Sequence, residues 1–78
     1  MRRMTLKDLA PGKEARVAKV NRKGAVGRRL VEMGLGPGCM VKVERYAPLG
    51  DPIEIKLQGT HISLRKIEAE MVEVEQEG

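Results

Sequence analysis

The chain has 78 residues, of which 41% are hydrophobic and 33% charged, and its formal net charge is +4. A chain this short predicts one domain over residues 1–78 with a thin core, because a fold of this size buries only about 60% of the surface its unfolded chain exposes. That argues against a deep active-site cleft. The lone Cys39 excludes an internal disulfide and is typical of the cytoplasm, and no apolar run has signal-peptide or membrane-spanning length, so direct membrane insertion is not expected.

The first quarter of the chain predicts a helical turn followed by a strand. In TLKDLAPG, residues 5–12, Thr5 fits an N-cap with Asp8 three residues later, and a Pro-Gly pair ends the turn. KEARVAKV, residues 13–20, supplies the strand, and a loop follows it.

Residues 25–33, AVGRRLVEM, form the one predicted helix. Three apolar side chains recur at i, i+4 and i+7 and therefore share one face: Val26, Leu30 and Met33. Gly34 is the C-cap candidate. Gly27 inside the segment costs about 1 kcal/mol relative to alanine, which predicts a short helix held by packing.

The second half of the chain predicts strands with one solvent-facing side. They are CMVKVERY (39–46), IEIKLQ (53–58), HISLR (61–65) and MVEVE (71–75), with KIEAE (66–70) as a tight turn or single helical turn. Alternation with period two turns the following residues inward: Ile53, Ile55, Leu57, Ile62, Leu64, Val72 and Val74. The acidic end at 76–78 is expected to fray.

An internal echo links the two halves. LAPGKEARV, residues 9–17, and LGPGCMVKV, residues 35–43, match with an offset of 26 residues. Two copies are too few for a repeat protein, so we interpret the echo as one Pro-Gly turn used twice to start a strand. Five to six short strands with one helix fit a mainly β fold, a small barrel of the SH3-like kind.

The charges fall in blocks. Seven basic residues and one acid lie between Lys13 and Arg29, whereas five glutamates and no base lie between Glu68 and Glu77. If the first and last strands of a barrel pair, Lys and Arg of residues 13–19 lie across from glutamates of residues 70–75, each pair adding at most about 1 kcal/mol.

Residues with catalytic or ligand chemistry are sparse. No nucleophile motif surrounds His61 or Ser63, and the glutamates are interpreted as solvated strand positions, so no enzyme is predicted. No Cys or His pair has a metal-ligand spacing; His61 is the candidate metal ligand, and no cofactor is expected beyond weak or adventitious divalent metal. Tyr46 is the only aromatic residue on which a base could stack, which argues against a nucleic-acid partner.

Three segments resemble the ferrous iron transport protein A (FeoA) family: MGLGPG at 33–38, APLGDPIEI at 47–55 and SLRKIEA at 63–69. The resemblance implies an SH3-like barrel that is a cytoplasmic accessory of the GTP-driven membrane ferrous iron transporter FeoB, with no enzyme activity. The function expected is an interaction module that docks on that transporter and regulates it, as a monomer or weak dimer. The alternatives are an independent ferrous iron sensor or carrier and a free-standing relative of the iron-dependent repressor C-terminal domain.

Two candidate partner-binding surfaces follow from the residues. The first is the rigid turn that comprises Pro48, Leu49, Gly50, Asp51 and Pro52, whose apolar tip is either a docking anchor or a plug over the open end of the barrel.

The second candidate concerns the helix stripe of Val26, Leu30 and Met33, which is either simply core or, where a thin core leaves it partly open, one side of an apolar groove beside the second Pro-Gly turn. The predicted lining of this groove is Leu30, Met33 and Leu35.

Overall fold

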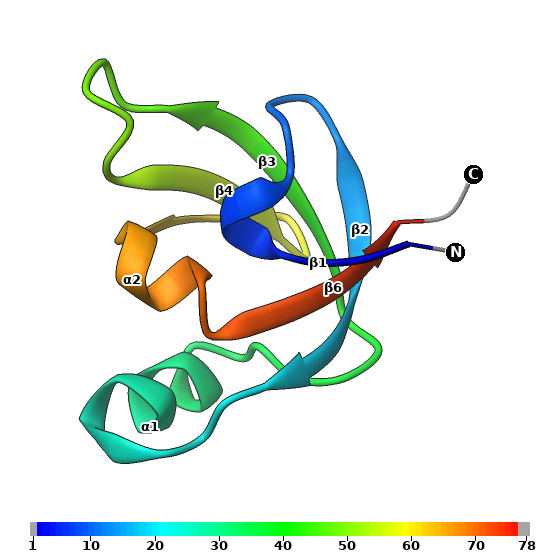
Figure 1. Ribbon diagram of the computed structural model, residues 1–78, viewed down its shortest axis with the longest axis vertical. Helices are drawn as coiled ribbons and strands as arrows, with labels where there is room; N and C mark the ends of the chain where they lie inside the picture. Colours follow the sequence, from blue (N-terminus) through cyan, green and yellow to red (C-terminus); the bar gives the residue numbers. More distant parts are fainter. Residues whose placement is uncertain (1, 77–78) are drawn as a thin grey trace.

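The computed structural model describes residues 2–76 (Figure 1). The elements in chain order are β1 (Arg2–Thr5), η1 (Leu6–Asp8), β2 (Glu14–Val20), α1 (Gly24–Glu32), β3 (Met40–Tyr46), β4 (Ile53–Leu57), β5 (Thr60–Leu64), α2 (Lys66–Ala69) and β6 (Val72–Gln76). The strands form one antiparallel sheet in the order β1-β6-β2-β3-β4-β5. Of the predicted frayed end, Gln76 ends β6, while residues 77–78 lie outside the described residues.

Every predicted strand is present, and the structure adds one that the sequence analysis did not predict. The segment RRMT forms β1 and pairs with β6, so that Arg3 lies opposite Glu75 and Met4 opposite Val74. A four-residue strand with two leading arginines carries almost no hydrophobic alternation. Its place in the sheet comes from pairing with β6, a distant partner that no local pattern reveals.

The expected pairing of charge blocks is confirmed by the register of β2 and β6. Arg16 lies opposite Glu75 and Lys19 opposite Glu73. Because β1 also pairs with β6, the acidic strand lies between two basic ones. β6 is therefore the second-to-last strand of the sheet and not its edge.

The core lies inside the curved sheet and is aliphatic. The predicted inward residues of β4 and β6 are buried, as is Leu64, whereas Ile62 is only half-buried. The turn η1, capped through the Thr5 backbone N–H that donates to the Asp8 carboxylate at 3.2 Å, adds Leu6 and Leu9 to this core. In Figure 1, η1 lies across the space between the strands.

An ion pair ties η1 to the end of α2. Lys7 Nζ donates a hydrogen bond to Glu70 Oε2 at 3.1 Å, and this carboxylate raises the pKa of Lys7 above its usual value. The ordinary pKa of lysine lies far above neutral pH, so the ammonium is charged and the contact is present under physiological conditions.

The two Pro-Gly turns are structurally equivalent. In each, the backbone N–H after the glycine donates to the carbonyl before the proline: Lys13 to Ala10 at 3.1 Å and Cys39 to Gly36 at 3.2 Å. Both glycines have positive φ, +86° at Gly12 and +92° at Gly38, as the third residue of a type II turn requires.

Each turn also bonds to the strand that follows the other turn. Gly12 N–H donates to the Val43 carbonyl at 2.7 Å, and Gly38 N–H donates to the Val17 carbonyl at 2.8 Å. Val17 and Val43 stand at the same position of the two sequence copies. The sequence echo therefore corresponds to a local two-fold relation between β2 and β3, in which the turn of each copy donates a hydrogen bond to the strand of the other copy.

Helix α1 is confirmed one residue earlier than predicted, and Met33 is its C-cap. The structure gives a reason for Gly27: a Cβ there would lie 2.4 Å from the Arg22 carbonyl carbon. The glycine is needed because the backbone of the preceding loop packs directly on the helix. Within residues 2–76, no helix is long and apolar enough to cross a bilayer.

The turn geometry predicts opposite outcomes for two neighbouring glycines. Gly38→Ala should lower the free energy of unfolding by about 1–2 kcal/mol, because an L-residue is strained at positive φ. Gly36→Ala should be neutral or slightly stabilising, since a Cβ there meets nothing within 4 Å and the equivalent residue of the first copy is already Ala10. Urea unfolding of both variants measures this, and equal destabilisation would contradict the assignment.

Candidate partner-docking site

Two backbone hydrogen bonds close the turn between β3 and β4. Gly50 N–H donates to the Ala47 carbonyl at 2.7 Å, with Pro48 and Leu49 as the central residues, and Ala47 N–H donates to the Pro52 carbonyl at 2.9 Å. Gly50 has φ +85°, a conformation that favours glycine. In Figure 1 the turn is the green loop beyond β3 and β4, at the end of the molecule opposite α1.

A third contact fixes the turn to α2. Asp51 Oδ1 accepts a hydrogen bond from the Lys66 backbone N–H at 3.0 Å, at the first residue of α2. The side chain of Lys66 lies beside Gly50, since a Cβ on Gly50 would be 3.8 Å from Lys66 Nζ. The turn is thus anchored to a second element.

Helix α2 is itself held by Glu68, which is buried with a side-chain exposure of 4%. Its Oε1 accepts a hydrogen bond from the Arg65 backbone N–H at 2.8 Å, and its Oε2 accepts one from Arg29 Nη1 of α1. The expectation that the glutamates are solvated is wrong for this residue. The short SLRKIEA segment has no Ser or Thr at the N-cap, so only a glutamate three residues after Arg65 indicated the cap.

Two large apolar side chains project from this region. Leu49 at the tip of the turn is 94% exposed, and Ile67 of α2 is 61% exposed. We call residues 47–52 together with residues 65–67 the turn–helix surface. Beside its apolar residues, Asp51, Pro52 and Arg65 line a hollow of about 220 Å³. The sequence analysis did not single out Ile67, because KIEAE was predicted only as a tight turn or a single helical turn.

The structure decides between the two interpretations of Leu49. A side chain with 94% of its area exposed does not cover the barrel, so the plug is wrong. η1 supplies Leu6 and Leu9 to the core instead. The alternative, a docking anchor, stays a prediction.

The groove predicted beside the second Pro-Gly turn is wrong for two of its three residues. Leu30 is 0% and Leu35 2% exposed, so neither can line an open groove, while Met33 is half-buried. The reason is the packing of α1 onto the sheet: the Leu35 backbone N–H donates to the Leu30 carbonyl at 3.2 Å, which folds the chain after the helix back over it.

His61 lies exposed on β5, where its Nδ1 is 2.6 Å from Glu44 Oε1. Among residues 2–76, no group of three or more His, Cys, Asp or Glu side chains is arranged to hold a metal ion. The Sγ of Cys39 has other neighbours, the Gly34 carbonyl oxygen at 3.5 Å and Gln58 Nε2 at 3.9 Å.

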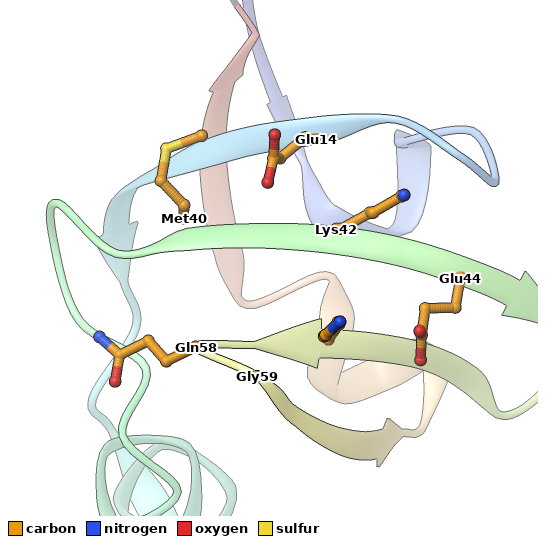
Figure 2. A pocket seen from close by; sticks show the side chains of 7 residues that line it. Glu14, Met40, Lys42, Glu44, Gln58 and Gly59 are labelled. Atoms are coloured by element: carbon orange, nitrogen blue, oxygen red, sulfur yellow. The ribbon is translucent and has the colours of Figure 1, made fainter.

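Figure 2 shows an open pocket of about 400 Å³ on the outer face of β2, β3 and β4. Its lining is Glu14, Met40, Lys42, Glu44, Lys56, Gln58 and Gly59. The register forms a transverse row across four strands, in which Glu14 faces Lys42, Lys42 faces Lys56, and Lys56 faces His61. The two lysines are like charges directly opposite each other, a destabilising arrangement for a sheet.

The FeoA domain model matches residues 4–76, almost the whole chain. The protein belongs to the FeoA family. One curated relative, a fusion of Fe(2+) transport protein A with the Fe(2+) transporter FeoB from Porphyromonas gingivalis, is 35% identical over 92% of this chain. This chain spans only 8% of the length of that relative.

Solved FeoA structures share the fold. The iron(II) transport protein A of Clostridium thermocellum is 42% identical with a TM-score of 0.87, covering 94% of this chain and 45% of that one. The zinc-complexed FeoA of Stenotrophomonas maltophilia, described as an SH3 domain protein, is 33% identical with a TM-score of 0.81, covering 92% and 89%. The six-stranded fold of this FeoA protein is therefore SH3-like.

The repressor alternative is supported at the level of fold alone. A manganese-dependent transcriptional repressor in complex with manganese has a TM-score of 0.88 but 15% identity, and it covers 99% of this chain and 38% of its own. Similarity of this kind does not transfer function.

The Glu68 contacts predict an asymmetry between two adjacent arginines of α1. Arg29→Ala should lower the free energy of unfolding by about 1–3 kcal/mol, because it leaves a buried carboxylate without its cation. Arg28→Ala, at an exposed position that makes no ion pair within residues 2–76, should change it by less than about 0.5 kcal/mol. Adding Glu68→Gln to Arg29→Ala should recover part of the loss in urea unfolding; equal effects of the two arginine variants would contradict this account.

The geometry around His61 predicts weak metal binding by the monomer. Calorimetry with ferrous iron and then zinc at neutral pH should show no site tighter than about micromolar, because two side chains are fewer than the three or four that hold zinc in proteins. His61→Ala is the matched variant. Tight one-to-one binding that is lost in His61→Ala would support an independent metal-binding protein instead.

Proposed function

We propose that this FeoA protein is a cytoplasmic interaction module that docks on a FeoB-type ferrous iron transporter and regulates iron uptake, without catalysing a reaction itself. The observation that carries the proposal is the Porphyromonas gingivalis relative, in which a segment 35% identical to this chain is joined to the transporter. Domains fused in one protein are held at high effective concentration, and a separate module needs a binding surface to achieve the same proximity.

The turn–helix surface supports the docking step. Hydrogen bonds from Gly50 to Ala47, from Ala47 to Pro52 and from Lys66 to Asp51 fix the turn before any partner arrives. A preorganised loop loses less conformational entropy on binding, so the exposed Leu49 can contribute more of its apolar area to affinity. Asp51 and Lys66 beside it supply polar groups that fix orientation.

The direction of regulation is proposed as activation. The Stenotrophomonas maltophilia protein is put forward as a possible activating factor of ferrous iron transport, and it is 33% identical over 92% of this chain. GTP chemistry belongs to the partner in this proposal, because the GLGPG segment has a proline where phosphate-binding loops need free backbone N–H groups.

Substitutions on the turn–helix surface test the docking step. Leu49→Ser and Ile67→Ser should weaken association with the transporter in a pull-down while thermal unfolding shifts by no more than a few degrees, because exposed substitutions cost little stability. Val31→Ser is the matched control, since Val31 is also apolar and 40% exposed but lies on α1; it should leave binding unchanged.

Asp51→Ala and Val43→Ala separate docking from stability. Asp51→Ala removes the acceptor for the α2 N-terminus and should weaken binding and lower the free energy of unfolding, the latter by an amount typical of a lost cap, about 1 kcal/mol. Val43→Ala opens a gap in the core at a fully buried residue and should lower the melting temperature while the folded fraction still binds. Unchanged binding by Leu49→Ser, Ile67→Ser and Asp51→Ala would overturn docking through this surface.

A further inference from the structure

β5 forms one edge of the sheet, and its backbone bonding follows from the hairpin that precedes it. The β4–β5 loop has two residues, Gln58 with φ +50° and Gly59 with φ +83°, which is the type I′ geometry. The residues that flank such a loop, Leu57 and Thr60, exchange backbone hydrogen bonds, and bonded pairs then alternate along the ladder.

This alternation shows which backbone groups of β5 are bonded to β4 and which are not. Thr60, Ile62 and Leu64 bond to β4, so the N–H and C=O groups of His61 and Ser63 point away from the sheet. Both residues are exposed, and within residues 2–76 no backbone group of either takes part in a hydrogen bond outside the ladder. The edge therefore offers two donors and two acceptors in the pattern that an added strand would need.

Three features that commonly protect an edge strand are absent from β5. Its sequence THISL contains no lysine and no proline, and its register with β4 has no bulge, although natural proteins commonly use these features to prevent pairing. The opposite edge, β1, begins with two arginines. Ile62, half-buried at the middle of β5, leaves part of an apolar side chain for an added strand to cover.

The charges around this edge favour an acidic occupant. Lys56 faces His61 on the outer face, Arg65 directly follows β5, and neither makes an ion pair within residues 2–76. Of the nearby acids, Glu54 is paired with Arg45 at 3.0 Å, Asp51 accepts the Lys66 backbone N–H, and Glu44 contacts the His61 ring. Lys42, beyond Lys56 in the same row, extends the positive charge.

We propose that the β5 edge binds an extended, acidic segment of another protein by strand addition, in which the backbone of His61 and Ser63 supplies the hydrogen bonds and Lys56 and Arg65 select the acidic side chains. The proposal deepens the proposed function, since the cytosolic part of the transporter is where such a segment is sought. A second copy of this chain fits this edge less well, because the strand it would add is β5 itself, whose sequence THISL has no acidic side chain to face Lys56 and Arg65.

Two proline substitutions form a matched pair that distinguishes loss of binding at the β5 edge from loss of stability of the fold. Ser63→Pro removes an outward N–H and blocks approach without breaking the ladder to β4, a position where strands tolerate proline. Ile62→Pro removes a ladder hydrogen bond and should lower the melting temperature clearly. Hydrogen exchange of the free protein should be fast at His61 and Ser63 and slow at Ile62, and slow exchange at all three would overturn the assignment of free groups.

The binding probe is a short peptide that alternates glutamate with valine, followed by backbone amide shifts in NMR. We expect shifts and new exchange protection at His61 and Ser63, at least about tenfold weaker binding by Ser63→Pro, and weaker binding of a lysine-valine peptide of the same length. Equal binding of the two peptides, full binding by Ser63→Pro, or no binding at millimolar peptide would overturn the proposal.

Two further measurements distinguish the other occupants and the proposed function. If sedimentation shows a dimer in which His61 and Ser63 are protected without peptide, the occupant is a second copy and the proposal is wrong. In the transporter pull-down, loss with Leu49→Ser but not with Ser63→Pro would support docking by the turn alone and overturn strand addition from the transporter. A wild-type protein that binds the acidic peptide but not the transporter would refute the proposed function and leave the edge site standing.

Discussion

Glu68 has 4% of its side chain exposed, and both of its carboxylate oxygens are bonded. One oxygen holds Arg29 of α1 and the other accepts the backbone N–H of Arg65 at the start of α2. The next backbone N–H, that of Lys66, is then oriented toward Asp51, which fixes the turn that carries Leu49. The position of the most exposed apolar residue thus depends on a carboxylate at the edge of the core.

Burying the charged carboxylate of Glu68 costs desolvation free energy, so a gain in stability alone does not explain its presence here. A buried ion pair often adds no net stability relative to a well-packed apolar pair, because taking both groups out of water costs several kcal/mol. Here Arg29 remains 56% exposed, so only the carboxylate is desolvated, and a backbone N–H accounts for its second oxygen. These hydrogen bonds are directional, whereas an apolar contact between α1 and α2 would not be. Directional bonds fix the orientation of α2, a four-residue helix that is too short to be stable alone.

Patterns that repeat along the chain could be predicted from the sequence. The alternation of Ile53, Ile55 and Leu57 predicts their burial in β4, and the two Pro-Gly copies predict equivalent turns, because both features depend on neighbours a few residues away. What could not be predicted depends on distant partners. β1 is part of the sheet because it pairs with β6 at the far end of the chain, and the carboxylate of the buried Glu68 is bonded to Arg29, 39 residues away.

The same limit explains the errors about surfaces. Hydrophobicity alone does not tell whether an apolar residue faces the core or solvent at the tip of a turn or in a single helical turn. Leu30 and Leu35 were expected to line a groove but are buried, whereas Ile67, of similar size, is exposed. The rigidity of the Ala47–Gly50 turn was predictable from Pro48 and Gly50, but its attachment through Asp51 to α2 was not.

The open edge and the turn–helix surface are connected by the chain itself. β5 ends at Leu64, and Arg65 leads at once into α2, whose first N–H holds the turn. A strand added to β5 would therefore have one end near Arg65 and Ile67. One partner segment could then bind by backbone hydrogen bonds at the edge and by an apolar side chain beside Leu49, and two weak contacts on one segment bind far more tightly than either alone. A small domain with a thin core can reach useful affinity in this way, because it needs only short, preorganised contacts that adjoin one another.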